Sequence, residues 1–129
     1  MTIPKENLHL QGLRGAITSQ SNNSEAIEAS VTALVKELVG RNHLKPDHIV
    51  SITFSVTPDL NACFPAAIAR KQDGWDNVAL LDCQQMSVKG DLKYCIRIMA
   101  LVWLPIDQTP QHPYLGEASL LRPDRSQNS

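Results

Sequence analysis

The feature that most constrains this chain is an apolar run from Cys95 to Leu104, in which Arg97 is the exception and the other nine residues are apolar. Such a continuous run predicts a strand whose two faces are both covered. A guanidinium in a buried strand costs several kcal/mol unless an anion and good hydrogen bonds meet it. Two interpretations stand: Arg97 snorkels from an edge strand or pairs with an internal carboxylate, or it binds an anionic ligand.

The segment before this run is expected to contain a strand and a turn. A short apolar strand is expected from Val78 to Leu81, and it should end where polar residues begin at Asp82. A Lys-Gly-Asp turn at 89–91 then leads into the long apolar run. The two strands and the polar stretch between them organise the chain.

Periodicity and turn residues predict the remaining elements. Leu10 to Thr18 and Ile49 to Val56 are expected to be strands, and 25–40 a helix with apolar residues every three or four positions. A short helix from Phe64 to Arg70 follows, and a mobile loop over 61–72 is the alternative. The order strand, helix, strand, short helix, strand, strand predicts an α+β fold: a mixed β-sheet with helices on one side.

Length and composition bound the class of protein. The 129 residues are expected to form a single domain, with 1–9 as a loose N-terminal arm and 125–129 as a flexible tail. The net charge of −1 gives no sign of a nucleic-acid or membrane partner. No apolar run reaches the ~18 residues of a membrane span, and the first residues lack a signal-peptide core. We therefore expect a cytoplasmic protein.

The cysteines and histidines form no recognisable ligand pattern. Three cysteines are an odd number without C-x-x-C spacing, and four histidines do not complete a metal-ligand set with them. Neither a metal site nor a disulfide framework is expected. The residues concerned are Cys63, Cys83, Cys95, His9, His43, His48 and His112.

Two glycines in the first expected strand flank an arginine. Gly12 and Gly15 stand on either side of Leu13 and Arg14. Glycines weaken a strand and often mark a place where another backbone or a ligand comes close. Arg14 is therefore a candidate site residue, with a solvated surface charge as the alternative.

An ordered set of short motifs resembles one enzyme family over residues 10 to 124. No single motif is decisive, but the set taken in order closely resembles the monofunctional chorismate mutases of the trimeric α/β-barrel class. The motifs are Arg14-Gly15-Ala16, Thr57-Pro58-Asp59-Leu60, Phe64-Pro65-Ala66, Gly74-Trp75, Gln84 with Met86, Cys95-Ile96-Arg97, Tyr114-Leu115 and Leu121-Arg122-Pro123-Asp124.

The resemblance implies a fold, an assembly and a reaction. Subunits would assemble into a homotrimeric pseudo-α/β barrel with active sites at the subunit clefts. The reaction would be the Claisen rearrangement of chorismate to prephenate, on the route to phenylalanine and tyrosine. A pericyclic rearrangement needs no nucleophile, general base, metal or cofactor. Catalysis then rests on holding a compact conformer and on placing fixed positive charge beside the developing ether oxyanion.

The resemblance also implies roles for individual residues. Arg97 would donate to the ether oxygen and one carboxylate, whereas Arg14 and Tyr114 would bind a carboxylate. Phe64 would pack on the substrate ring. The structural alternative for both aromatic residues is a place in the core, because buried aromatic side chains usually belong there.

A second group of residues would line and cover the site. Side-chain and backbone contacts to the substrate hydroxyl would come from Leu81, Asp82, Cys83, Gln84 and Gln85. Arg70, with Leu121 and Arg122 near the tail, would steer and cover the anion, although surface arginines often contribute nothing measurable. The expected catalytic residues are Arg97, Arg14, Gln85 and Asp82.

The chain departs from the family pattern at three positions. The family commonly has Cys at position 82 and Glu at 85, and often Lys at 67, whereas this chain has Asp82, Gln85 and Ala67. One hypothesis is that Asp82 takes over the charge while Gln85 keeps the hydrogen bond. The alternative is that Asp82 caps the following turn, as Asp often does.

A function of a different class stays open at this point. A non-catalytic trimer that binds and reports on an anionic metabolite would use the same arginines, because charge complementarity alone does not distinguish binding from turnover. Loss of the usual Glu favours this alternative. Arg97 together with Arg14 and Tyr114 favours the enzyme.

Overall fold

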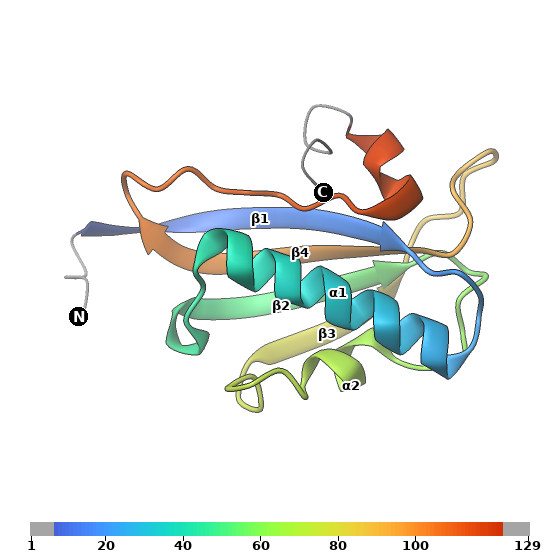
Figure 1. The fold of residues 1–129 in the computed structure, drawn as a ribbon, viewed down its shortest axis with the longest axis horizontal. Helices are drawn as coiled ribbons and strands as arrows, with labels where there is room; N and C mark the ends of the chain where they lie inside the picture. Colours follow the sequence, from blue (N-terminus) through green and yellow to red (C-terminus); the bar gives the residue numbers. More distant parts are fainter. Residues whose placement is uncertain (1–6, 123–129) are drawn as a thin grey trace.

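The computed structural model describes residues 7–122 and contains one four-stranded sheet with helices on one side (Figure 1). The strands are β1 (Leu8–Thr18), β2 (Ile49–Val56), β3 (Ala79–Gln84) and β4 (Cys95–Pro105). The helical elements are α1 (Ser24–Asn42), the short 3-10 helix η2 (Pro46–His48), α2 (Pro65–Ala69) and the 3-10 helix η3 (Gly116–Leu121).

The strands lie in the order β1-β4-β2-β3. β4 is antiparallel to both of its neighbours, and β2 and β3 form a parallel pair connected through α2. The predicted mixed α+β sheet is confirmed. The strand with Arg97 is a central one, so the edge-strand interpretation of this arginine is wrong.

Helix α1 has the signals that its sequence predicts. The Asn23 side chain accepts a hydrogen bond of 2.8 Å from the Ala26 N–H at its start, and His43 ends it in the left-handed conformation. The apolar stripe is buried against the sheet: Ile27, Val31, Leu34, Val35 and Leu38.

Several boundaries differ from those expected. β1 begins at Leu8, because this residue pairs with Pro105; Leu8 and His9 therefore belong to the sheet and not to an arm. β3 runs on to Gln84 because its parallel pairing with β2 continues through the polar residues. Phe64 and Arg70 flank α2 as its caps. The expected arm before residue 7 and the tail at 125–129 lie outside the described residues.

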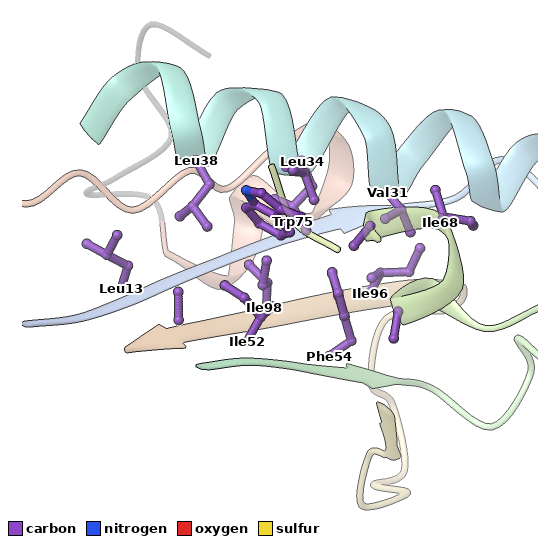
Figure 2. Packing of buried hydrophobic residues seen from close by; sticks show 14 of the residues in the cluster. Leu13, Val31, Leu34, Leu38, Ile52, Phe54, Ile68, Trp75, Ile96 and Ile98 are labelled. Carbon is purple, nitrogen blue, oxygen red and sulfur yellow. The ribbon is translucent and has the colours of Figure 1, made fainter. Parts of the chain in front are cut away.

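The core lies between the sheet and the two helices. Figure 2 shows Trp75 beneath α1 beside Leu34, with Phe54 and Ile98 projecting from the sheet. These side chains are almost wholly buried. Within residues 7–122, no helix combines the length and apolar character needed to cross a bilayer.

Helices α1 and α2 do not cover the opposite face of the sheet, and its end at Ala16 is covered by Tyr114 and by Ala118 of η3. Alternation along each strand places one set of side chains there, and several of its large apolar members are exposed. Leu81 is 60% exposed and Met99 55% exposed. We call the following set the open face: Leu10, Gly12, Arg14, Ala16, Ser51, Thr53, Ser55, Ala79, Leu81, Cys83, Arg97, Met99, Leu101 and Trp103.

Candidate active site

Arg97 lies on the open face near the start of β4, opposite Ala16 of β1 and Ser55 of β2. A cavity of ≈ 360 Å³ adjoins it. Its lining combines two arginines with hydroxyl groups: Arg14, Gly15, Thr53, Ser55, Arg97, Ile98, Met99 and Tyr114. The structure therefore brings together Arg14, Arg97 and Tyr114, which can bind a carboxylate.

A segment beyond β4 returns along β1 and positions Tyr114. The Arg14 N–H donates to His112 Nδ1 at 3.0 Å, and the Ala16 N–H donates to the Pro113 carbonyl at 3.0 Å. A Cβ atom on Gly15 would lie 2.6 Å from that Pro113 oxygen. The close backbone approach predicted at the two glycines is confirmed at Gly15, whereas among residues 7–122 nothing beyond its chain neighbours comes within 4 Å of a Cβ on Gly12.

A polar network at the end of β2 fixes the start of β4. The Cys95 N–H donates to Thr57 Oγ1 at 2.9 Å, and Thr57 Oγ1 donates to Asp59 Oδ1 at 2.6 Å. The Asp59 carboxylate also accepts from the Tyr94 N–H, whose residue has a positive φ of 53°. This strained backbone comes three residues before Arg97, so the Thr57–Asp59 pair helps to set the position of the guanidinium.

A second hollow adjoins Arg97 on the side of the β3–β4 connection. It measures ≈ 590 Å³, and its lining includes Gln85, Asp91 and Arg97. The Gln85 N–H donates to the Val56 carbonyl at 2.8 Å, which continues the pairing past β3 and places Gln85 on the open face. Ser55 and Arg97 line both hollows, so the guanidinium lies between them.

Asp91 is a residue of this site that the sequence did not reveal. Its carboxylate accepts a hydrogen bond of 2.7 Å from Gln85 Nε2, and its Oδ1 lies 3.8 Å from Arg97 Nη2. Arg97 therefore has an internal carboxylate partner. The only sequence signal is the turn that contains Asp91, six residues from both Gln85 and Arg97.

The Arg97 charge also acts on its strand neighbour. Burial raises the pKa of the Cys95 thiol, and the nearby Arg97 guanidinium opposes this rise. Cys95 packs with Tyr114 and Ala118 in a small apolar cluster. The thiol is thus a protonated packing group next to the site.

Asp82 lies on the covered face of β3, opposite Phe54. Its Oδ1 accepts a hydrogen bond of 2.9 Å from the Ala66 N–H in the first turn of α2. Burial raises the pKa of this carboxyl, against the opposing effects of the Ala66 bond and the Arg70 charge. These contacts favour a capping role, for α2 instead of the following turn, and argue against Asp82 taking over the charge beside Gln85.

Several expected site residues do not reach the Arg97 cavities within one chain. Phe64 is 71% exposed and begins α2, and Arg70 ends it, near the β3 edge of the sheet. Asp82 contacts the same short helix. The chain therefore presents two groups: Arg14, Gln85, Arg97 and Tyr114 on the open face, and Phe64, Arg70 and Asp82 around α2.

The other expected residues divide between these groups. Leu81 and Cys83 project onto the open face, whereas Gln84 alternates to the opposite one. Leu121 packs against the cluster that contains Tyr114, and Arg122 follows it, half-buried. Among residues 7–122, no group of three His, Cys, Asp or Glu side chains is arranged to hold a metal ion.

The chain is similar to known proteins over most of its length. Residues 10–125 match the family described as "Chorismate mutase type I". The chain is 39% identical over 118 residues to chorismate mutase AroH of Bacillus subtilis (strain 168), covering 91% of this chain and 93% of that protein. It is 38% identical over 120 residues to chorismate mutase AroH of Thermus thermophilus, covering 89% and 95%.

A solved structure is similar in both fold and sequence. The chorismate mutase from Clostridium thermocellum superposes with a TM-score of 0.79 at 39% identity, covering 85% of this chain and 98% of that one. The family match spans the two arginines, the β3–β4 connection and Tyr114. This chain belongs to the type I chorismate mutase family.

Proposed function

We propose that this protein catalyses the rearrangement of chorismate to prephenate in the synthesis of aromatic amino acids. The observation that carries the proposal is the position of Arg97 between the two cavities, with its Nε buried and without a hydrogen-bond partner among the described residues. A guanidinium with an unused donor is suited to an atom that gains negative charge only in the transition state.

The residues around Arg97 match the groups that chorismate carries. Arg97 donates to the ether oxygen as its bond breaks, and Arg14 with Tyr114 holds a carboxylate. The free Gln85 Oε1 accepts the hydrogen bond of the ring hydroxyl. These contacts select a compact conformer whose reacting carbons are close together. The rearrangement itself moves bonds within one molecule, so no cofactor or metal has a part in the proposal.

The active form in this proposal is a homotrimer. The exposed apolar side chains of the open face, including Leu81, Met99 and Trp103, form a surface that suits burial against other copies. Phe64 and Arg70, which flank α2, then have a role in the site of a neighbouring subunit. Phe64 packs on the ring there and Arg70 steers the anion.

The decisive experiment follows the loss of chorismate absorbance on adding purified protein, without added metal or cofactor. We expect conversion to prephenate with saturation kinetics. Tight binding of chorismate without conversion would reject the enzyme and leave an anion-binding protein.

The assembly is tested by subunit mixing and by light scattering. Arg97→Ala and Arg70→Ala subunits, each impaired alone, should regain activity when mixed, because some sites then contain both intact groups. Light scattering at micromolar concentration should give the mass of a trimer. A fully active monomer would eliminate the shared site.

The expected cytoplasmic location belongs to the same proposal and agrees with three free cysteines.

A further inference from the structure

Asp91 holds two side chains of the candidate site at once. Its Oδ2 accepts the Gln85 Nε2 hydrogen bond at 2.7 Å, and its Oδ1 faces Arg97 Nη2 at 3.8 Å. Its side chain is only 21% exposed, although it belongs to the connection between β3 and β4. Aspartate side chains are mostly exposed, so the burial of this carboxylate between an amide and a guanidinium indicates a specific role for Asp91.

The local backbone fixes the Asp91 carboxylate before any ligand binds. The Asp91 N–H donates to the Val88 carbonyl at 3.1 Å, which closes a turn with Gly90 at a φ of 84°. Glycine is the residue that adopts this conformation without strain. The Leu92 N–H donates to Asp91 Oδ1 at 2.8 Å and limits rotation of the side chain.

The first consequence concerns the orientation of the Gln85 amide. An amide has a donor end and an acceptor end, whereas an ionised carboxylate only accepts. Asp91 therefore forces the Nε2 end toward itself and the Oε1 end away. Gln85 Oε1 is buried without a hydrogen-bond partner among the described residues, in the hollow that Arg97 also lines. An unused acceptor at that point can take a hydrogen bond from a ligand or from an ordered water.

The second consequence concerns the Arg97 guanidinium. The 3.8 Å separation from Asp91 is within ion-pair range but too long for a hydrogen bond. The carboxylate thus offsets the cost of holding a cation in the sheet without consuming its donors. Arg97 Nε is buried and unpartnered among the described residues, and the side chain as a whole is 40% exposed and lines both hollows.

We propose that Asp91 is a positioning residue of this site, which turns the Gln85 carbonyl oxygen toward a substrate hydroxyl and holds Arg97 in place for an oxyanion. The proposal rests on the proposed function for the identity of the hydroxyl-bearing, anionic substrate. The contacts of Asp91 with Gln85 and Arg97 exist without the substrate, so they can be measured separately.

The first test replaces Asp91 by asparagine. An amide at position 91 has both a donor and an acceptor end and no charge, so it no longer dictates the Gln85 orientation. We expect Asp91→Asn to lower kcat about tenfold, with KM unchanged or lower because a negative charge has left an anion-binding site. Asp107→Asn makes the same charge change at the exposed far end of β4 and should leave both constants unaltered.

The second test exchanges the carboxylate and the amide across the same hydrogen bond. Gln85→Glu alone sets two carboxylates against each other and should be impaired. The double variant Gln85→Glu/Asp91→Asn again pairs one carboxylate with one amide, and should recover to within about threefold of the unmodified protein. Purely additive losses would overturn the proposal, as would an Asp91→Asn enzyme with undiminished kcat.

A measurement without substrate separates this proposal from the proposed function. In nuclear magnetic resonance spectra, the Gln85 side-chain amide signals should move in Asp91→Asn and stay fixed in Asp107→Asn. Unmoved signals would reject the positioning role even in an active enzyme. If the unmodified protein did not convert chorismate, the proposed function would fall, and a shift of these signals would still support the role of Asp91.

Discussion

On the face of the sheet that the helices cover, β4 presents an unbroken series of buried apolar side chains from Ile96 to Leu104, whereas its open face carries Arg97, Met99 and Trp103. Both series are mainly apolar in sequence. The covered face is complete within one chain, but the open face leaves apolar side chains exposed around a charged cavity. The same strand thus serves folding with one face and binding with the other.

The difference shows how a stable sheet can hold a charged side chain such as Arg97 on one face. The core behind β4 is built by Phe54, Ile98 and Trp75, so the strand is held whether or not Arg97 has a ligand. The free energy of folding comes mainly from burial on that side. The open face is then free to keep unpaired donors, which are useful only when a substrate arrives.

The largest effect on the free energy of unfolding is expected from a substitution in the core on the covered face. Phe54→Ala removes a fully buried ring and should lower the free energy of unfolding by about 3–5 kcal/mol. Thr53→Ala, one residue away on the open face, should change it by less than about 1 kcal/mol. Denaturant titration compares the two. Equal losses would show that both faces contribute alike to stability within the chain.

The complementary change removes the charge from the open face. Arg97→Ala should cost about 3–4 kcal/mol in kcat/KM, comparable to the loss of an oxyanion donor, while unfolding changes little. Arg97→Lys should be nearly as poor, because a lysine lacks the forked donor geometry. Steady-state kinetics provides the measurement. Near-normal turnover of the lysine variant would contradict the role assigned to Arg97.

A third change concerns the exposed apolar side chains. Trp103 is 41% exposed at the end of β4 distant from Arg97, so Trp103→Glu places a charge on the open face away from the cavity. If that face is buried in a trimer, the variant should dissociate to smaller species, because an unpaired charge in an interface is costly. Ala33→Glu, on the exposed side of α1, should leave the mass unchanged. Light scattering distinguishes the two.

Much of the fold could be predicted because its signals are local. Alternation located β2 at its observed bounds, Ile49–Val56, and helical spacing with an N-cap located α1. The length of β3 was missed because its continuation to Gln84 depends on pairing with β2, which local composition does not reveal. Pairing is a tertiary effect that overrides the polar residues.

The site was less predictable, since its contacts join distant segments. Arg97 could be identified as a candidate site residue because it is a charge in an apolar run. Gly15 indicated a close backbone approach, which the structure shows to be that of Pro113. The Asp91 contacts require a turn to fold back on the sheet, and a six-residue spacing does not predict that. The Asp82 side chain was associated with Gln85, but strand alternation directs it toward α2.

The smallest expected effect tests which face Asp82 serves. Asp82→Ala removes the acceptor of the Ala66 N–H and should destabilise the protein by about 1 kcal/mol, whereas Asp82→Asn can keep that bond. Both should affect kcat less than Asp91→Asn does, because Asp82 lies on the covered face of its own chain. A larger loss of kcat in Asp82→Asn than in Asp91→Asn would make Asp82 the functional carboxylate.

The pH dependence of stability gives the same residue an independent signature. Burial raises the pKa of Asp82, so the folded protein binds this proton more tightly than the unfolded chain does. The contribution of Asp82 to stability is therefore largest below the unfolded pKa and falls as pH rises through the folded pKa. Asp82→Asn lacks this titration, so its stability relative to the unmodified protein should increase from pH 3 to pH 7. The opposite trend would mean that the Ala66 bond and the Arg70 charge outweigh burial, and that Asp82 is held as a stabilised anion.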